Sequence, residues 1–291
     1  MKKRGQITIF MILALSVMII LGLLYYIIGY NTKAKSTQII MEASDSKDIG
    51  IVKSYAESCL KSVSEDALFK RAGIHGGYIE PNGSLLYNED PLPDGQKTYF
   101  LNNSVPYYLE ADCKSSCAFN ENIPKESAII EKLQNYIIVE FQKCLNTTVF
   151  EDIGLSIAKP AQNINVDVSL NKEDVSIKLN YPLTITSGKA RIALDFFAVT
   201  LPIRLKALYS SSIELVQKIE AANSGEYIIT PADCISFDKN GLTNVYVKSS
   251  DNGPKEIIQF VDFSTYEKYY FHSYIFQFAV KNIRVDGNCV G

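Results

Sequence analysis

The sequence predicts an α+β fold, in which an N-terminal transmembrane helix extends into a helical stem and then a head of helices packed on a mostly antiparallel sheet. Three observations predict it. An uncharged apolar run ends at Tyr30, two later segments repeat apolar residues with a helical period, and alternating apolar residues with turn signals fill the C-terminal half. Such segregation of helical and strand patterns is typical of α+β domains. We divide the chain into residues 1–30, signal and transmembrane helix; 31–73, stem helix; 74–159, loop-rich segment and second helix; and 160–291, β-rich α+β domain.

The first segment joins a basic start to a long apolar run. Lys2, Lys3 and Arg4 precede the run, and no charged residue lies between Gln6 and Tyr30. A membrane-spanning helix needs about 20 predominantly apolar residues, so the segment predicts one span. Because positive residues favour the cytoplasmic side, we expect a cytoplasmic N-terminus at the cell membrane and a largely extracytoplasmic chain. A cleaved secretory signal is the alternative, although its apolar region has only about 7 to 15 residues.

The residues before this run, Lys3-Arg4-Gly5-Gln6-Ile7, resemble the class III signal peptide of archaeal type IV pilins and related surface-filament subunits. The resemblance implies that a prepilin-type peptidase cuts between Gly5 and Gln6 and leaves the apolar helix on the mature chain. A helix that is apolar on all faces must be buried. The resemblance therefore implies membrane lipid as a partner before assembly, and copies of itself or other pilins afterwards. A chain of 291 residues is long for a major pilin, which implies a minor or specialised subunit, or an anchored protein that only shares the signal.

The composition allows a substantial core and argues against nucleic-acid binding. Apolar residues make up 47% of the chain, the net charge is −3, and charges of both signs are interspersed without a basic patch. An even number of cysteines beyond the apolar run favours disulfides in an oxidising environment. The cysteines are Cys59, Cys113, Cys117, Cys144, Cys234 and Cys289.

The pairing of these cysteines is open on sequence alone, since six cysteines allow about 15 connectivities. Cys113 and Cys117 can close a small loop by themselves. Cys59 and Cys144 each lie near the apolar stripe of a helical segment, so we predict that they pair and that the two helices pack together. The two segments also share a short similarity, Ser58-Cys59-Leu60 against Lys143-Cys144-Leu145, and the alternative is that this similarity is a coincidence.

The last two cysteines, Cys234 and Cys289, bracket the C-terminal β-rich region, and we predict that they form the third pair. Zinc is the alternative to disulfides, but a zinc site needs about four ligands. The chain has only His75 and His272, and neither is suitably spaced from a cysteine pair, so no metal is expected.

The helical and loop segments follow from local patterns. Apolar residues recur every three or four positions from Ile49 to Ala67, which predicts a helix that stops at Gly73. Residues 74–122 are rich in Gly, Pro, Asn and Asp and predict a loop-heavy insert with small strands. Pro124 suits the start of a second helix over about residues 125–145.

The strands are predicted by alternation. Residues 163–170 and 175–181 alternate apolar and polar positions around the turn Asn171-Lys-Glu-Asp174, which predicts a hairpin. A further strand is expected over 190–205, and a short helix over about 211–222 that stops at Asn223-Ser-Gly225. Beyond it, β-branched and aromatic residues predict strands at 226–230, 244–248, 256–262 and 269–285.

Three Asn-x-Ser/Thr triplets, at Asn82, Asn102 and Asn146, are candidate glycosylation sites. No catalytic constellation accompanies them. The phosphate-binding glycine loops, the Gly-x-Ser-x-Gly elbow and the His-Glu-x-x-His motif are all missing from the sequence. His75 lies among glycines and is the one candidate for acid-base chemistry, against the simpler interpretation as a turn histidine. We therefore expect no enzyme, no catalytic residue and no cofactor.

These patterns leave two main hypotheses of function. The first is a membrane-anchored, disulfide-bonded, glycosylated surface protein of the archaeal pilin-like kind, with a structural or adhesive role. The second is a single-pass anchored ectodomain that binds a ligand or partner protein and never polymerises. A third and weaker hypothesis is an extracytoplasmic enzyme that uses His75.

Overall fold

The computed structural model describes residues 46–79, 96–101, 103–113, 117–160, 164–237, 243–250, 253–265 and 272–289. The chain divides into two compact units, residues 1–47 and 48–291. The elements below belong to the second unit, which the helix α2 (Ser46–Asp66) enters from the first.

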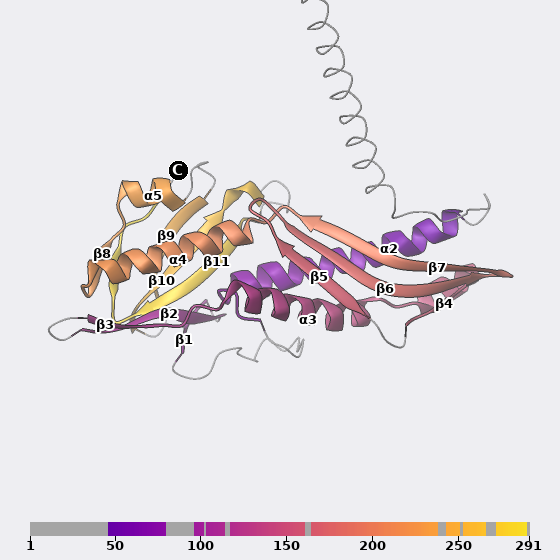
Figure 1. The fold of residues 1–291 in the computed structure, drawn as a ribbon, viewed down its shortest axis with the longest axis horizontal. Helices are drawn as coiled ribbons and strands as arrows, with labels where there is room; N and C mark the ends of the chain where they lie inside the picture. Colours follow the sequence, from indigo (N-terminus) through magenta and orange to yellow (C-terminus); the bar gives the residue numbers. More distant parts are fainter. Residues whose placement is uncertain are drawn as a thin grey trace, which may run out of the picture. The chain divides into compact units, whose positions relative to one another are not determined.

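The described residues form a mixed α/β fold, and about 42% of them are in strands. This corrects the expected α+β class (Figure 1). The strand β2 (Asn103–Cys113) pairs in parallel with β11 (Tyr274–Lys281), and the sheet is therefore mixed. Parallel pairing joins strands that are far apart in sequence, so alternation within either strand could not reveal it.

The expected single-pass membrane anchor is also corrected. Among the described helices, none is long and apolar enough to cross a membrane. α2 has 21 residues but is amphipathic, because its lysine and glutamate side chains form exposed pairs such as Lys53–Glu57 and Lys61–Glu65. The span expected at residues 1–30 lies outside the described residues. The structure thus gives no support to a transmembrane protein or to the expected location at the cell membrane.

A four-stranded antiparallel sheet forms the first layer. It contains β4 (Leu155–Ala158), β5 (Asn165–Leu170), β6 (Val175–Ser187) and β7 (Ala190–Leu201). The expected hairpin is β5–β6, with Asn165 opposite Asn180 and Leu170 opposite Val175. Every second side chain of β6 from Val175 to Ile185 is buried, so one face of this sheet is apolar.

Two helices cover that apolar face (Figure 1): α2 and α3 (Glu126–Cys144). Phe141 of α3 packs edge-on against Tyr181 of β6, with ring centroids 5.3 Å apart. The short 3-10 helix Thr148–Ile153 adds Phe150, whose ring centroid lies 5.3 Å from that of Tyr55 in α2. The helix pair is closed by a disulfide between Cys59 and Cys144.

α2 continues as a π-helix, Ala67–Gly73, and the expected stop at Gly73 has a steric reason. A Cβ atom at Gly73 would lie 2.3 Å from the carbonyl oxygen of Ile275 in β11. Only glycine permits this approach, because real Cβ atoms do not come so close to a backbone oxygen. Gly73 therefore sets where the N-terminal helix meets the second sheet.

The second sheet has six strands, in the order β1-β2-β11-β10-β9 with β3 also on β2. They are β1 (Lys97–Phe100), β2, β3 (Cys117–Glu121), β9 (Thr243–Ser250), β10 (Gly253–Asp262) and β11. β1, β2 and β3 come from the segment expected to be loop-rich, and they share this sheet with C-terminal strands. The helix α4 (Leu205–Ala222) packs on it through Tyr209, whose ring centroid is 6.4 Å from that of Phe276.

A buried ion pair fixes the start of α4 on this sheet. Arg204 donates two hydrogen bonds to the Asp262 carboxylate, at 3.1 and 2.7 Å, and a third to Thr243 Oγ1 at 2.9 Å. Both charged side chains are nearly fully buried. Asp262 ends β10, where the 3-10 helix Phe263–Thr265 follows.

The C-terminal part closes with short elements. β8 (Glu226–Ile228) pairs in parallel with β12 (Arg284–Asp286). Between β8 and β9 lies the helix α5 (Pro231–Phe237), which the sequence analysis did not anticipate. Its Phe237 packs against Phe260, with ring centroids 5.7 Å apart.

Candidate functional site

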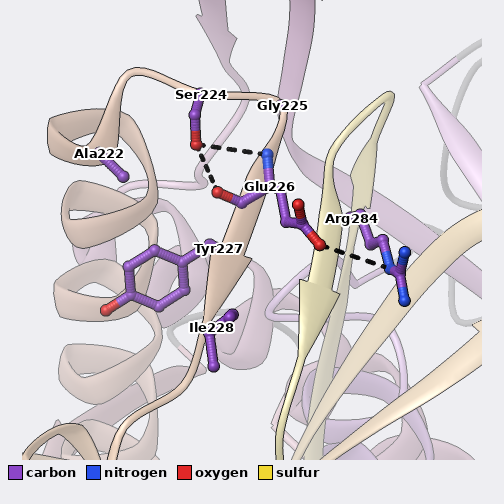
Figure 2. A pocket seen from close by; sticks show the side chains of 7 residues that line it. All are labelled: Ala222, Ser224, Gly225, Glu226, Tyr227, Ile228 and Arg284. Carbon is purple, nitrogen blue, oxygen red and sulfur yellow. Dashed lines mark hydrogen bonds and ion pairs between the residues drawn. The ribbon is translucent and has the colours of Figure 1, made fainter.

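A depression of about 780 Å³ lies where α4 ends and β8 begins (Figure 2). Its lining comes from the end of α4, the following turn, β8 and β12. The lining residues are Ala222, Ser224, Gly225, Glu226, Tyr227, Ile228 and Arg284.

The turn that shapes this depression follows from the expected helix stop. α4 ends at Asn223, which has the left-handed φ of 46° that asparagine tolerates, and its N–H donates to Glu220 O at 2.9 Å. Ser224 then donates to the carbonyl of Glu226, and the Arg284 N–H donates to Gly225 O at 2.9 Å. These bonds bring β8 beside β12.

The two sides of β8 differ in chemistry. Figure 2 shows the Tyr227 ring on one side of the strand and the Glu226–Arg284 pair on the other. Arg284 Nε lies 3.8 Å from Glu226 and 3.0 Å from Asp286, and all three side chains are exposed. Ile228 is 62% exposed at the same place. Exposed ion pairs contribute little stability. This surface therefore has an exposed apolar side chain beside charged groups that a partner could contact without loss of stability.

On its other side, β8 joins a cluster around Asp233. The Asp233 carboxylate accepts hydrogen bonds from the Tyr227 hydroxyl at 3.1 Å and from the Thr230 N–H and Lys218 Nζ at 2.8 Å each. The Asp233 N–H in turn donates to Thr230 Oγ1 at 3.3 Å. Reciprocal bonds of this kind form a capping box, which satisfies the first N–H groups of α5.

The pKa values of this cluster oppose acid-base catalysis near neutral pH. Burial alone would raise the pKa of Asp233, but the hydrogen bonds from Lys218, Thr230 and Tyr227 outweigh it and lower that pKa to about 2. Burial, together with the hydrogen bond and charge of Asp233, raises the pKa of Tyr227 to about 12. A general acid or base works best with a pKa near the operating pH, so these groups hold α5 in place instead.

A second depression, of about 470 Å³, lies beside the first turn of α4. Its lining carries charges of both signs, from Lys172, Arg204 and Lys206 and from Glu173 and Glu214. However, Arg204 is held by Asp262, and Lys206 Nζ donates to Glu126 at 2.9 Å. Its positive charge is thus largely used in holding elements together.

The structure places the two histidines in different local settings. His75 sits in a turn with Gly76 and Gly77, both at positive φ, and its Nδ1 lies 2.8 Å from Ser104 O and 3.0 Å from Ser104 Oγ. These contacts fix the turn against β2, as a turn histidine would. His272 precedes β11, and its carbonyl accepts a hydrogen bond from Thr265 at 3.3 Å.

Three disulfides use all the cysteines. Cys59 pairs with Cys144, Cys113 with Cys117, and Cys234 with Cys289, which are the pairings expected from the sequence. In the part of the chain that the structure describes, no group of three or more His, Cys, Asp or Glu residues is placed to hold a metal ion.

Of the candidate processing and glycosylation residues, the structure describes Asn146. Gly5, Gln6, Asn82 and Asn102 lie outside the described residues. Asn146 is exposed, and its Oδ1 accepts hydrogen bonds from the Thr148 N–H at 3.1 Å and the Thr148 hydroxyl at 2.8 Å. The third residue of the triplet therefore contacts the asparagine amide that would carry a glycan.

Sequence reasoning missed the Asp233 cluster, although a signal was present. Thr230 and Asp233 have the Ser/Thr-x-x-Asp/Glu spacing of a capping box, and Pro231 occupies the first helical position between them. The apolar and aromatic residues around this stretch favoured a continuous β-rich interpretation instead.

Comparisons with known proteins assign no family. No protein-family model matches the chain, and no solved structure matches it. The chain is similar to the nuclear distribution protein PAC1 of Candida glabrata, with 26% identity over 159 residues. That match covers 47% of this chain and 34% of the relative, so the chain spans about a third of the relative's length. These comparisons give no support to the expected archaeal, pilin and membrane features.

Proposed function

We propose that this chain is a non-catalytic structural subunit, processed in the pilin-like manner that Gly5 and Gln6 imply, whose disulfide-bonded head contacts other proteins. The observation that carries the proposal is the disulfide between Cys59 and Cys144. It covalently attaches α2, the first described helix, to α3, the other helix that covers the four-stranded sheet.

This attachment suits a subunit that transmits mechanical force. Cys59 is 4% exposed and lies among the buried residues of α2, which pack into the main core. A disulfide restricts how far two elements can separate even when their packing opens locally. A pull transmitted along α2 would therefore reach α3 and the sheet through a covalent bond as well as through apolar contacts.

The chemistry of the described depressions supports binding over catalysis. Asp233 and Tyr227 have pKa values far from neutrality, and Arg204 is committed to Asp262. The accessible groups of the first depression, Ile228 and Arg284, are suited to contact with a protein surface. The name of the partly similar nuclear distribution protein mentions neither a filament nor a peptidase. The proposal therefore rests on the sequence and on these contacts.

The processing is tested by intact-mass and N-terminal peptide mass spectrometry on protein from its native source. We expect a mature chain that begins at Gln6. A Gly5→Leu variant should retain its first residues, because the cleaving peptidase requires a small residue there. Gly50→Leu is the matched control, since nothing lies within 4 Å of a Cβ at Gly50. A wild-type chain that still begins at Met1 or Lys2 would rule out pilin-like processing.

The second candidate function is partner binding without assembly, which the exposed Ile228 beside Arg284 favours. The two functions differ in where the protein is recovered. A structural subunit should be found in fibres sheared from the cells, made of many copies of the chain. A binding protein that does not assemble should be missing from that fraction.

A further inference from the structure

The strand β7 lies at the margin of the four-stranded sheet (Figure 1). It pairs with β6 along its whole length, from Ala190 opposite Ser187 to Leu201 opposite Val175. No other described strand pairs with β7. An edge strand of this length presents a row of unpaired N–H and C=O groups, which is a template for another strand.

The side chains along β7 leave this edge accessible. Arg191, Ala193 and Asp195 are exposed, and Phe196 is 48% exposed. Leu194 is buried, so the strand still belongs to the core on its other face. Within the described residues, neither Arg191 nor Asp195 takes part in an ion pair.

Proteins usually protect such an edge with proline, a bulge or charges that repel a second copy. β7 contains no proline, and its two charged residues have opposite signs and stand four positions apart. These opposite charges make the edge complementary to that of an identical strand. The one irregularity of the β6–β7 pair lies in β6, between Asn180 and Leu183, opposite Asp195 of β7.

An antiparallel pair of β7 strands centred on Ala193 places these charged side chains opposite partners of the opposite sign. Arg191 of one copy lies opposite Asp195 of the other, and the two-fold axis repeats the pair. In the same register Ile192 of one copy stands opposite Leu194 of the other, on the face of the ladder away from Arg191, Ala193 and Asp195. Cross-strand pairs of these kinds each add stability to an antiparallel ladder.

We propose that two copies of this chain associate through β7, antiparallel and centred on Ala193, so that their four-stranded sheets form one continuous sheet. A two-fold axis makes such an interface self-complementary and closed. The pairing goes beyond the proposed function and does not depend on processing at Gly5, so each can fail without the other.

A cysteine placed on the two-fold axis tests the register. In the full-length chain, Ala193→Cys should give a dimer on a non-reducing gel, with a disulfide between the two introduced cysteines confirmed by peptide mapping. Ala198→Cys is the matched control, because it is also an exposed alanine of β7. In the proposed register its two copies would stand about 34 Å apart, at about 3.4 Å per residue.

Two results on the non-reducing gel would exclude the β7 pairing. A folded Ala193→Cys protein that stays monomeric on the gel would exclude the pairing. Equal crosslinking of Ala193→Cys and Ala198→Cys would show random collision or assembly elsewhere on the chain, and would also exclude it. Circular dichroism should match wild type for both variants, because both side chains are exposed.

Charge reversal supplies an independent measurement. Arg191→Asp and Asp195→Arg each place like charges opposite one another, so each should weaken dimerisation on the order of tenfold. The double variant restores opposite charges and should recover the dimer. Sedimentation equilibrium measures the dissociation constants of wild type, the two single variants and the double variant. A double variant no tighter than the single variants would contradict the register.

Discussion

Asp233 illustrates how one carboxylate can organise a whole corner of the molecule. It caps α5, accepts the Tyr227 hydroxyl of β8 and pairs with Lys218 of α4 at 2.8 Å. Asp233→Asn keeps the shape but loses the charge, so we expect the free energy of unfolding to fall by about 1 to 3 kcal/mol. Urea denaturation measures this loss. Asp286→Asn, which alters an exposed carboxylate, should change stability by less than about 0.5 kcal/mol.

The pH dependence of this contribution follows from the lowered pKa of Asp233. Its pKa is about 2 in the folded protein against the ordinary 3.8, so the folded state favours the ionised carboxylate. The stability that it contributes is present above pH 3.8 and is lost as the pH falls toward 2. The difference between wild type and Asp233→Asn should therefore be constant near neutrality and shrink in acid. A difference that grew in acid would contradict this assignment.

Among the elements, the junction between the N-terminal helix and the second sheet depends on Gly73. A Cβ there would lie 2.3 Å from Ile275 O and 3.2 Å from the Tyr274 ring. Gly73→Ala should thus destabilise the fold by about 1 to 3 kcal/mol through overpacking. Gly50→Ala in α2 has open space and should stabilise by about 0.5 to 1 kcal/mol through helix propensity. Thermal unfolding of both variants tests the contrast.

Elements with a clear period could be predicted from the sequence, and their partners could not. The stripe from Ile49 to Ala67 and the alternation of β6 depend only on which face is buried, and the structure has both. The parallel pairing of β11 with β2 depends on contacts between residues more than one hundred positions apart. A small strand was expected within residues 74–122, but the full length of β2 was not, because β2 has buried residues on both faces and therefore no alternation.

At the candidate site too, local features could be predicted from the sequence and long-range pairings could not. The helix stop at Asn223 could be anticipated from a local signal, and the three cysteine pairs match those expected from the positions of the cysteines in the helical and β-rich segments. The depression beside Arg284 could not, because it needs β12 to return alongside β8 from the far end of the chain. The segments expected at residues 74–159 and 160–291 likewise supply strands to one sheet, through the parallel pairing of β2 with β11.

For the molecule as a whole, the disulfides differ in how much chain they constrain. Cys59–Cys144 spans a separation of 85 residues, whereas Cys113–Cys117 spans 4. Because cross-link stabilisation grows with loop length, we expect Cys59→Ser/Cys144→Ser to lower the free energy of unfolding by about 4.5 kcal/mol. Cys113→Ser/Cys117→Ser is the matched control and should cost about 2 kcal/mol. Equal losses, measured by denaturant unfolding, would contradict the loop-length argument.

The Cys59–Cys144 bond also determines how the molecule responds to proteases. It closes a covalent ring that contains β1, β2 and β3. A single cut of the backbone inside that ring leaves one molecule of unchanged mass apart from an added water, because both sides remain tied through sulfur. Only reduction would release two fragments. A nicked copy would therefore stay joined to the rest of any assembly in an oxidising environment, and a nick would become a break only where thiols are abundant.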